Sequence, residues 1–243
     1  MKTRLWALSL GPRSPDRNGL NPHSPDYRKS GDDLRAHLIR HAGLTPESRV
    51  LDIGCGTGRL AHALRDYITT GVYHGVDLNR GHIDHCRKQF TFCKGYRFKH
   101  LDYYHQEWNP KGSREEYKLP YEPGTLDIIV MVGVLNHLDI KRAADLIHHA
   151  APLLRSYGSL AATVRLLNHH SMAHLRQDQY PYRTHESWYA DRTRPLLDIA
   201  VPEEGFRRVL IHSRLQIREP IRYGTWGSSS GPLDQDLLVA VKV

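Results

Sequence analysis

The residues best suited to chemistry form an acidic, glycine-rich pattern, Asp52-x-Gly54-x-Gly56-x-Gly58. It begins inside a short apolar run, residues 50–53, that suits a buried strand, and helix-forming residues follow it. Glycine lets the chain turn tightly and lets a ligand approach the backbone, and a helix start presents free N–H groups. A strand, a glycine loop and a helix in this order predict a ligand-binding turn in an α/β sheet.

A second acidic residue, Asp77, ends the next strand-like segment, residues 72–77. It stands about twenty residues beyond the loop, the interval at which an acid binds ribose hydroxyls in nucleoside-binding folds. The glycines fall at every second position, whereas nicotinamide-binding folds use G-x-G-x-x-G. The loop and the acid-tipped strand together resemble the first two motifs of the class I S-adenosylmethionine-dependent methyltransferases.

The resemblance implies S-adenosylmethionine as the cofactor, with the glycine loop under its methionine part and Asp77 on its ribose. It also implies an adenine contact at the end of the third strand, where an acid accepts from the amino group and the next backbone N–H meets the ring. The expected cofactor-binding residues are Asp52, Gly54, Cys55, Gly56, Gly58, Asp77, Leu78, Asp102, Tyr103 and Gly133. Asp102 also suits a helix cap or turn. Arg59 or Arg80 could pair with the methionine carboxylate as a fork, or could be solvated at the surface.

Methyl transfer to oxygen or nitrogen calls for a base that removes a proton, and histidine is the usual choice. His137 follows the fourth expected strand by a few residues and is the first candidate catalytic residue. The alternative is a histidine that caps the next helix or packs beneath the cofactor. His169 is the second candidate, at the tip of the fifth expected strand, together with its neighbour His170. We expect no metal, because adjacent histidines on a helix point in different directions and no acidic cluster is present.

The remaining pattern predicts an α/β fold with a doubly wound, mostly parallel seven-stranded sheet, a Rossmann-like methyltransferase fold with an antiparallel C-terminal strand. Residues 1–31, rich in proline, are expected to form an N-terminal arm or lid, and residues 32–243 the methyltransferase domain. A helix is expected to open at Asp32. The sixth strand is placed at 209–211, and the seventh at 233–243. The long polar connection 104–124 is expected to form part of the substrate wall.

The length, composition and charge of the chain limit the kinds of function that it can have. The chain has 243 residues, 40% of them hydrophobic, and a net charge of +8, which suits one α/β domain. No apolar stretch reaches the roughly 20 residues that span a bilayer, so we expect a cytoplasmic protein. Three cysteines without a C-x-x-C pair suggest neither disulfides nor zinc. The basic charge makes a nucleic-acid partner possible, but it is not favoured, because the cations are scattered.

Three further stretches resemble a bacterial subgroup that acts on small molecules or cell-surface glycans. They are 109–113 with 119–121, then 135–137, then 223–226 with 235–236. Two positions depart from that subgroup: Asn136 stands where threonine is expected, and Arg165 where an apolar or aromatic residue is expected. The resemblance implies a small-molecule or glycan-type acceptor, but both departures lie near the expected pocket, so the identity of the substrate is not carried over. An RNA or tRNA methyltransferase and a non-catalytic, cofactor-binding partner subunit stay open as alternatives, as does the oligomeric state.

Overall fold

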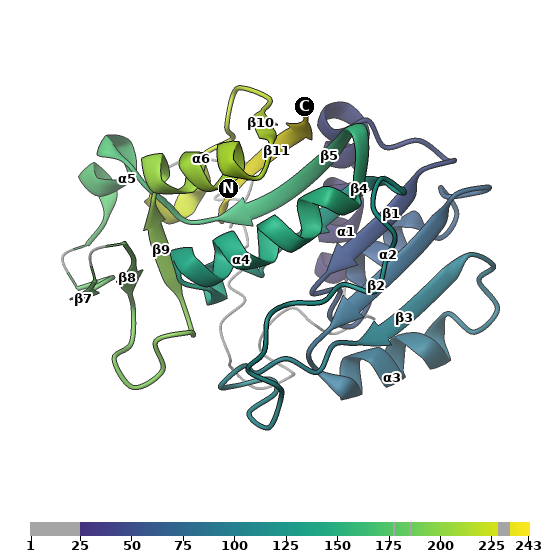
Figure 1. Cartoon of the computed structure of the whole chain (residues 1–243), viewed down its shortest axis with the longest axis horizontal. Coiled ribbons are helices and arrows are strands. Elements are labelled where there is room, and N and C mark those ends of the chain that lie inside the picture. The colour runs from purple at the N-terminus through teal and green to yellow at the C-terminus, as the bar shows by residue number, and fades with distance from the viewer. Residues whose placement is uncertain (1–24, 177, 185, 228–233) are drawn as a thin grey trace.

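A computed structural model describes residues 25–243, apart from 177, 185 and 228–233. Its centre is a seven-stranded sheet with the order β10-β11-β5-β4-β1-β2-β3 (Figure 1). The strands are β1 (Arg49–Ile53), β2 (Val72–Asp77), β3 (Tyr96–His100), β4 (Leu126–Met131), β5 (Leu154–Val164), β10 (Leu215–Ile217) and β11 (Asp236–Lys242). The first five pair in parallel, and β11 pairs antiparallel with both β5 and β10. The predicted fold class is confirmed, including the antiparallel C-terminal strand.

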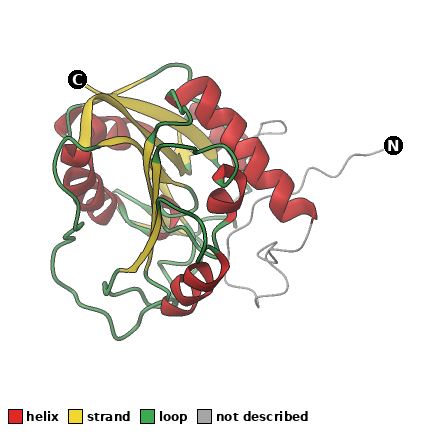
Figure 2. Cartoon of the chain, turned by 90° about the vertical axis from the view of Figure 1, so that its right-hand side faces the viewer, coloured by secondary structure: helices red, strands yellow, loops and turns green. Residues whose placement is uncertain are grey.

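Helices cover both faces of the sheet (Figure 2). They are α1 (Pro25–His37), α2 (Arg59–Leu64) and α3 (Arg80–Gln89) on one face, and α4 (Ile140–Ala150) and α6 (Glu203–His212) on the other. Successive residues of a strand point to opposite faces, and β4 shows this directly. Ile128 and Val130 pack with α1 to α3, whereas Ile129 and Met131 pack with α4 and α6. A central strand that is apolar on both faces is therefore explained by helices on both sides.

A second, smaller sheet has the order β6-β9-β8-β7 and lies beyond the end of β5. Its strands are β6 (Leu166–Leu167), β7 (Tyr182–Arg183), β8 (Trp188–Tyr189) and β9 (Ile199–Pro202). Within this sheet, the short helix α5 (His169–His174) follows β6 and precedes β7 in the chain. Among the described residues, none of the helices has the length and apolar character needed to cross a membrane.

The first helix differs from its prediction. Its described part already includes Pro25, whereas the prediction opened the helix at Asp32; proline is tolerated in the first turn of a helix. Tyr27, in that added part, is 1% exposed. The helix continues into a π-helical turn, Leu38–Ala42. Of the expected arm, residues 1–24 lie outside the described part of the chain.

The predicted sixth strand is also wrong, since Val209 to Ile211 belong to α6 and the strand is β10. Phe206 and Leu210, one helical turn apart, are buried, while Ile211 is 69% exposed. This spacing is helical, and Glu203 in the first turn suits a helix start. The apolar run was short enough to fit either structure.

Candidate functional site

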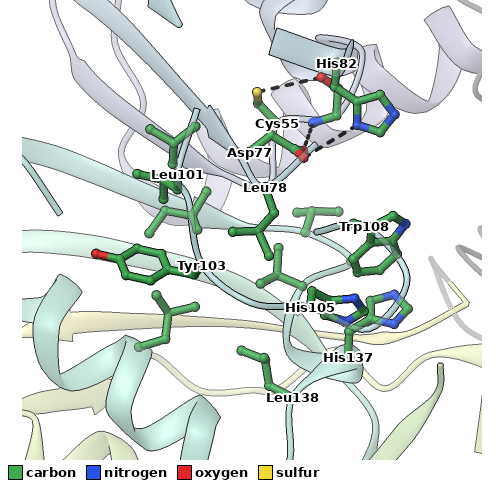
Figure 3. A pocket seen from close by; sticks show the side chains of 18 of the residues that line it. Cys55, Asp77, Leu78, His82, Leu101, Tyr103, His105, Trp108, His137 and Leu138 are labelled. Carbon is green, nitrogen blue, oxygen red and sulfur yellow. Dashed lines mark hydrogen bonds and ion pairs between the residues drawn. The ribbon is translucent and has the colours of Figure 1, made fainter. Parts of the chain in front are cut away.

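A cavity lies at the carboxyl ends of β1, β2 and β4, where ligands bind in doubly wound sheets. The glycine loop and Asp77 form one wall of it. Segments after β3 and β4 form the others (Figure 3). Because parallel strands run in the same direction, the segments that follow them lie at the same edge of the sheet, although they are distant in the sequence.

Backbone conformation and lack of space for a side chain both favour glycine in the loop. Gly54 and Gly56 have φ angles of +77° and +55°, which side chains rarely adopt. A Cβ on Gly54 would lie 2.4 Å from Cγ2 of Val134, so packing excludes it. A Cβ on Gly56 would meet no atom within 4 Å, although Gly56 lines the cavity. The loop therefore presents bare backbone to open space. Gly58 has a φ angle of +89°, and a Cβ there would lie 2.8 Å from Cε2 of Phe90.

Asp77 is fixed by the backbone around it. One carboxylate oxygen, Oδ2, accepts a hydrogen bond from the N–H of Gly56 at 2.8 Å, and Oδ1 accepts from the N–H of Asn79 at 2.7 Å. Nδ1 of His82 lies 3.6 Å from Oδ1. A carboxylate has about four acceptor positions, so each oxygen keeps capacity for a ligand hydroxyl. Asp77 thus links the loop to β2 and still faces the cavity.

Asp52 lies behind this wall and is 5% exposed. Tyr73 donates its hydroxyl hydrogen to it, and burial raises the pKa of Asp52 to about 6. It does not line the cavity, whereas its neighbour in the loop, Cys55, does. Arg59 also lines the cavity, and burial lowers the pKa of its guanidinium. Among the described residues, no hydrogen bond or ion pair holds that guanidinium.

An apolar wall of Leu78, Leu101 and Tyr103 faces the cavity beside Asp77 (Figure 3). Asp102 is exposed and does not line the cavity, and its Oδ1 accepts from Nδ2 of Asn109 at 3.0 Å. The hydroxyl of Tyr103 donates to the carbonyl of Lys118 at 3.0 Å. These bonds join Asn109 and Lys118 of the long connection to the residues that follow β3.

The segment after β4 supplies the floor. Gly133, with φ of +72°, donates its N–H to Oγ1 of Thr163 at 2.9 Å, and Thr163 donates to Gln235 at 2.6 Å. The short 3-10 turn Leu135–His137 follows and brings His137 to the cavity. Gly133 thereby lies at the same cavity as the glycine loop, as the resemblance implies.

His137 is 2% exposed and belongs to a cluster of rings. Its ring centroid lies 4.5 Å from that of Trp108, with the planes nearly perpendicular, and 6.2 Å from that of His105. His105 stacks on Trp108 at 4.2 Å. Burial lowers the pKa of His105 to about 4, with the nearby His137 as a further cause. The three rings stand on the opposite side of the cavity from Leu101 and Tyr103 (Figure 3).

The other expected residues lie elsewhere. His169 and His170 begin α5, are exposed, and border a different surface depression beside Glu203 and Tyr223. Arg80 contacts His100 at 3.3 Å and does not line the cavity. No group of three or more His, Cys, Asp or Glu residues suited to a metal ion occurs within the described ranges.

Tyr27 and His105 are among the lining residues that were not expected. Tyr27 reaches the cavity from α1, in the part assigned to the arm, and its hydroxyl lies 3.1 Å from Oγ1 of Thr57. His105 follows the expected adenine contact within the long connection, and Nδ1 of its ring accepts from the N–H of Glu107 at 3.2 Å. Its position three residues after Asp102 is the feature of the sequence that could have indicated His105 as a lining residue.

Comparison with known proteins gives a family match over residues 51–160, described as a methyltransferase domain. Among solved structures, an S-adenosylmethionine-dependent methyltransferase from Methanosarcina mazei is similar, with a TM-score of 0.60 and 19% identity, over 84% of this chain and 97% of that one. The Synechocystis magnesium protoporphyrin IX methyltransferase, solved with bound S-adenosylhomocysteine, has a TM-score of 0.58 and 17% identity, over 89% and 84%. A Pyrococcus horikoshii protein has a TM-score of 0.65 and 15% identity, over 91% and 93%.

Proposed function

Because this chain belongs to the class I S-adenosylmethionine-dependent methyltransferases, we propose that it methylates an oxygen or nitrogen atom of a small-molecule or glycan-type acceptor. The observation that carries the proposal is the single cavity shared by Asp77 and His137. The first comes from a cofactor motif, and the second follows β4 on the opposite side (Figure 3). When bound, S-adenosylmethionine supplies an activated methyl group on sulfur.

The lining residues fit this cofactor from end to end. Asp77 accepts hydrogen bonds from the two ribose hydroxyls, using the acceptor positions that Gly56 and Asn79 leave open. The bare backbone at Gly56 lets the methionine part lie close to the loop. Arg59, half-buried in the cavity wall, pairs with the methionine carboxylate as a fork.

The adenine ring fits between Leu78, Leu101 and Tyr103, which form the apolar part of the wall. Asp102 does not line the cavity, so the adenine contact at this strand end comes from Tyr103, while Oδ1 of Asp102 accepts from Asn109. Asp52 lies buried behind the loop, where the hydroxyl of Tyr73 donates a hydrogen bond to it, and it does not touch the cofactor. The remaining loop residues, Gly54, Cys55 and Gly58, give the turn its shape and packing.

The acceptor end is formed by flat rings. Trp108 stacks on His105 through one face and meets His137 at right angles. An aromatic wall with polar ring atoms suits the face of a sugar or a planar small molecule, because such ligands combine an apolar face with hydroxyl groups. We therefore place the acceptor against Trp108.

His137 is the proposed base. Of the histidines considered from the sequence, it alone lines the cavity, and His169 and His170 lie exposed on α5. Nδ1 of His137 donates to the carbonyl of Leu196 at 3.0 Å, which orients the ring and leaves Nε2 as the nitrogen that takes a proton. Removal of that proton from a hydroxyl or amine prepares it to attack the methyl group in line.

The test is transfer of label from S-adenosyl-[methyl-¹⁴C]methionine to a panel of sugars, nucleoside-sugars, catechols, small amines and bulk tRNA. We expect label in at least one small molecule with stoichiometric release of S-adenosylhomocysteine. Label in tRNA alone would establish the RNA reading instead. Tight cofactor binding with no transfer to any member of a broad panel would favour the non-catalytic partner.

A further inference from the structure

Asn136 and Arg165, the two positions at which the sequence departs from the bacterial subgroup that it resembles, lie near one carboxylate. Asp198, just before β9, accepts from Nε of Arg165 at 2.9 Å and from the hydroxyl of Tyr180 at 2.9 Å. The side chain of Asn136 lies beside Asp198 and favours the charged form of that carboxyl, as a hydrogen-bond donor does. The same amide reaches His137, since its Nδ2 lies 3.1 Å from Nε2 of that ring. A polar chain therefore runs from the end of β5 to the cavity.

The direction of each hydrogen bond follows from chemistry. The carbonyl of Leu196 only accepts, so Nδ1 of His137 carries a hydrogen. The carboxylate of Asp198 only accepts, so the amide must turn its NH₂ group toward it. Nδ2 of Asn136 has two hydrogens, and the second points at Nε2 of His137. In the neutral ring that nitrogen holds a lone pair, and the amide donates to it.

The amide oxygen of Asn136 supports this orientation of the side chain. Oδ1 is buried and has no hydrogen-bond partner within the described residues. An unsatisfied buried acceptor is unfavourable, so a contact of the NH₂ group, and none of the oxygen, holds the amide in this orientation. The reversed amide would place its oxygen against the carboxylate of Asp198, which is repulsive. Arg165 and Tyr180 secure that carboxylate, and Arg165 is held on its other side by Asp234 at 3.0 Å.

We propose that Asn136, anchored by Asp198, is a positioning residue that holds His137 as the neutral tautomer with its hydrogen on Nδ1 and its lone pair on Nε2. The inference rests on the proposed role of His137 as the base. A hydrogen on Nε2 would face the N–H of Asn136, so the network opposes the imidazolium form. A base must be unprotonated before it acts, and the amide maintains that state until an acceptor O–H or N–H replaces the amide hydrogen on Nε2.

Other charged groups near His137 are few among the described residues. His105 faces it from the long connection, with a low pKa that keeps its own ring neutral. Asp198 acts through Asn136, and Arg165 lies beyond Asp198. Asp139 follows two residues later and caps α4 through the N–H of Arg142.

The experiment follows His137 by ¹⁵N NMR of histidine-labelled protein loaded with S-adenosylhomocysteine, assigned by difference from His137→Gln. We expect a pyrrole-type signal from Nδ1 and a pyridine-type signal from Nε2. Asn136→Leu, which removes the donor, should raise the titration midpoint of His137 by about one unit. Asp198→Asn should raise it by less, because the amide can then turn either way. Asn168→Leu, which removes an amide that caps α5, is the matched control and should leave it unchanged.

An unchanged or lower midpoint in Asn136→Leu, or a hydrogen on Nε2 in the parent protein, would overturn the proposal. If Asn136→Leu does not fold, Asp198→Asn decides the question by the same criterion. The acid limb of the methyl-transfer rate, measured with the best acceptor from the panel, separates the two claims. If the midpoints shift as expected and the acid limb does not follow them, the positioning role stands and the base role fails.

Discussion

Replacing Asp77 with alanine tests the cofactor end of the cavity. The carboxylate is proposed to accept charge-assisted hydrogen bonds from the ribose, and bonds of this kind contribute about 1.5–3 kcal/mol each. Part of that is recovered by water in the variant, so we expect a loss of about 2–3 kcal/mol in binding. At 1.4 kcal/mol per factor of ten, the Kd for S-adenosylhomocysteine should rise roughly 30- to 150-fold.

The same substitution also removes the acceptor for the N–H of Gly56, which could loosen the loop by itself. Calorimetry with S-adenosylhomocysteine and its 2′-deoxy analogue separates the two effects. In the parent protein, the missing hydroxyl should weaken binding at least tenfold. In Asp77→Ala the two ligands should bind with nearly equal affinity, because the partner of that hydroxyl is gone.

Asp66→Ala is the matched control, since Asp66 is exposed and pairs only with Arg65 among the described residues. It should leave both affinities unchanged. An unchanged Kd in Asp77→Ala would remove this residue from the cofactor site. A variant that still distinguishes the two ligands as well as the parent does would show that the ribose is bound by other groups.

Three further predictions concern the buried titratable groups. His137→Ala should lower turnover by roughly 10²-fold or more and spare the Kd for S-adenosylmethionine, whereas His169→Ala should retain the full rate; equal rates in the two variants would exclude His137 as the base. The pKa of His105 is lowered to about 4, so the free energy of unfolding falls by up to about 3 kcal/mol as the pH falls from 6.5 to 4. Measured by urea unfolding at pH 7 and pH 5, this fall should be smaller in His105→Phe than in the parent protein. The pKa of Asp52 is raised to about 6, so its contribution is lost as the pH rises from 4 to 6; the stability of Asp52→Asn relative to the parent should increase over that window, and a flat difference would contradict the assignment.

The cofactor motifs could be predicted because their signal is local. The glycines follow β1 directly, and Asp77 ends β2, so two short segments carry the pattern. The strands that meet in the sheet centre are apolar on both faces and are easily distinguished. The α6 segment failed for the opposite reason, since three apolar residues in a row are compatible with a strand or a helix.

The acceptor end could be predicted only in part, because it depends on contacts between distant segments. Trp108 was expected at the substrate wall from its place in a long aromatic connection, but its stacking with His105 was not. Asn136 and Arg165 were recognised only as departures, and their common partner Asp198 lies 62 residues beyond Asn136 in the numbering of the chain. Nothing in the spacing of these residues indicates that they meet.

The most direct test of the account is a crystal structure of the protein with S-adenosylhomocysteine. We expect the ribose hydroxyls within hydrogen-bond distance of the Asp77 carboxylate, the amino-acid part over Gly56, and the sulfur facing the side of the cavity formed by Trp108 and His137. A ligand bound elsewhere, or one whose sulfur faces away from Trp108 and His137, would contradict it.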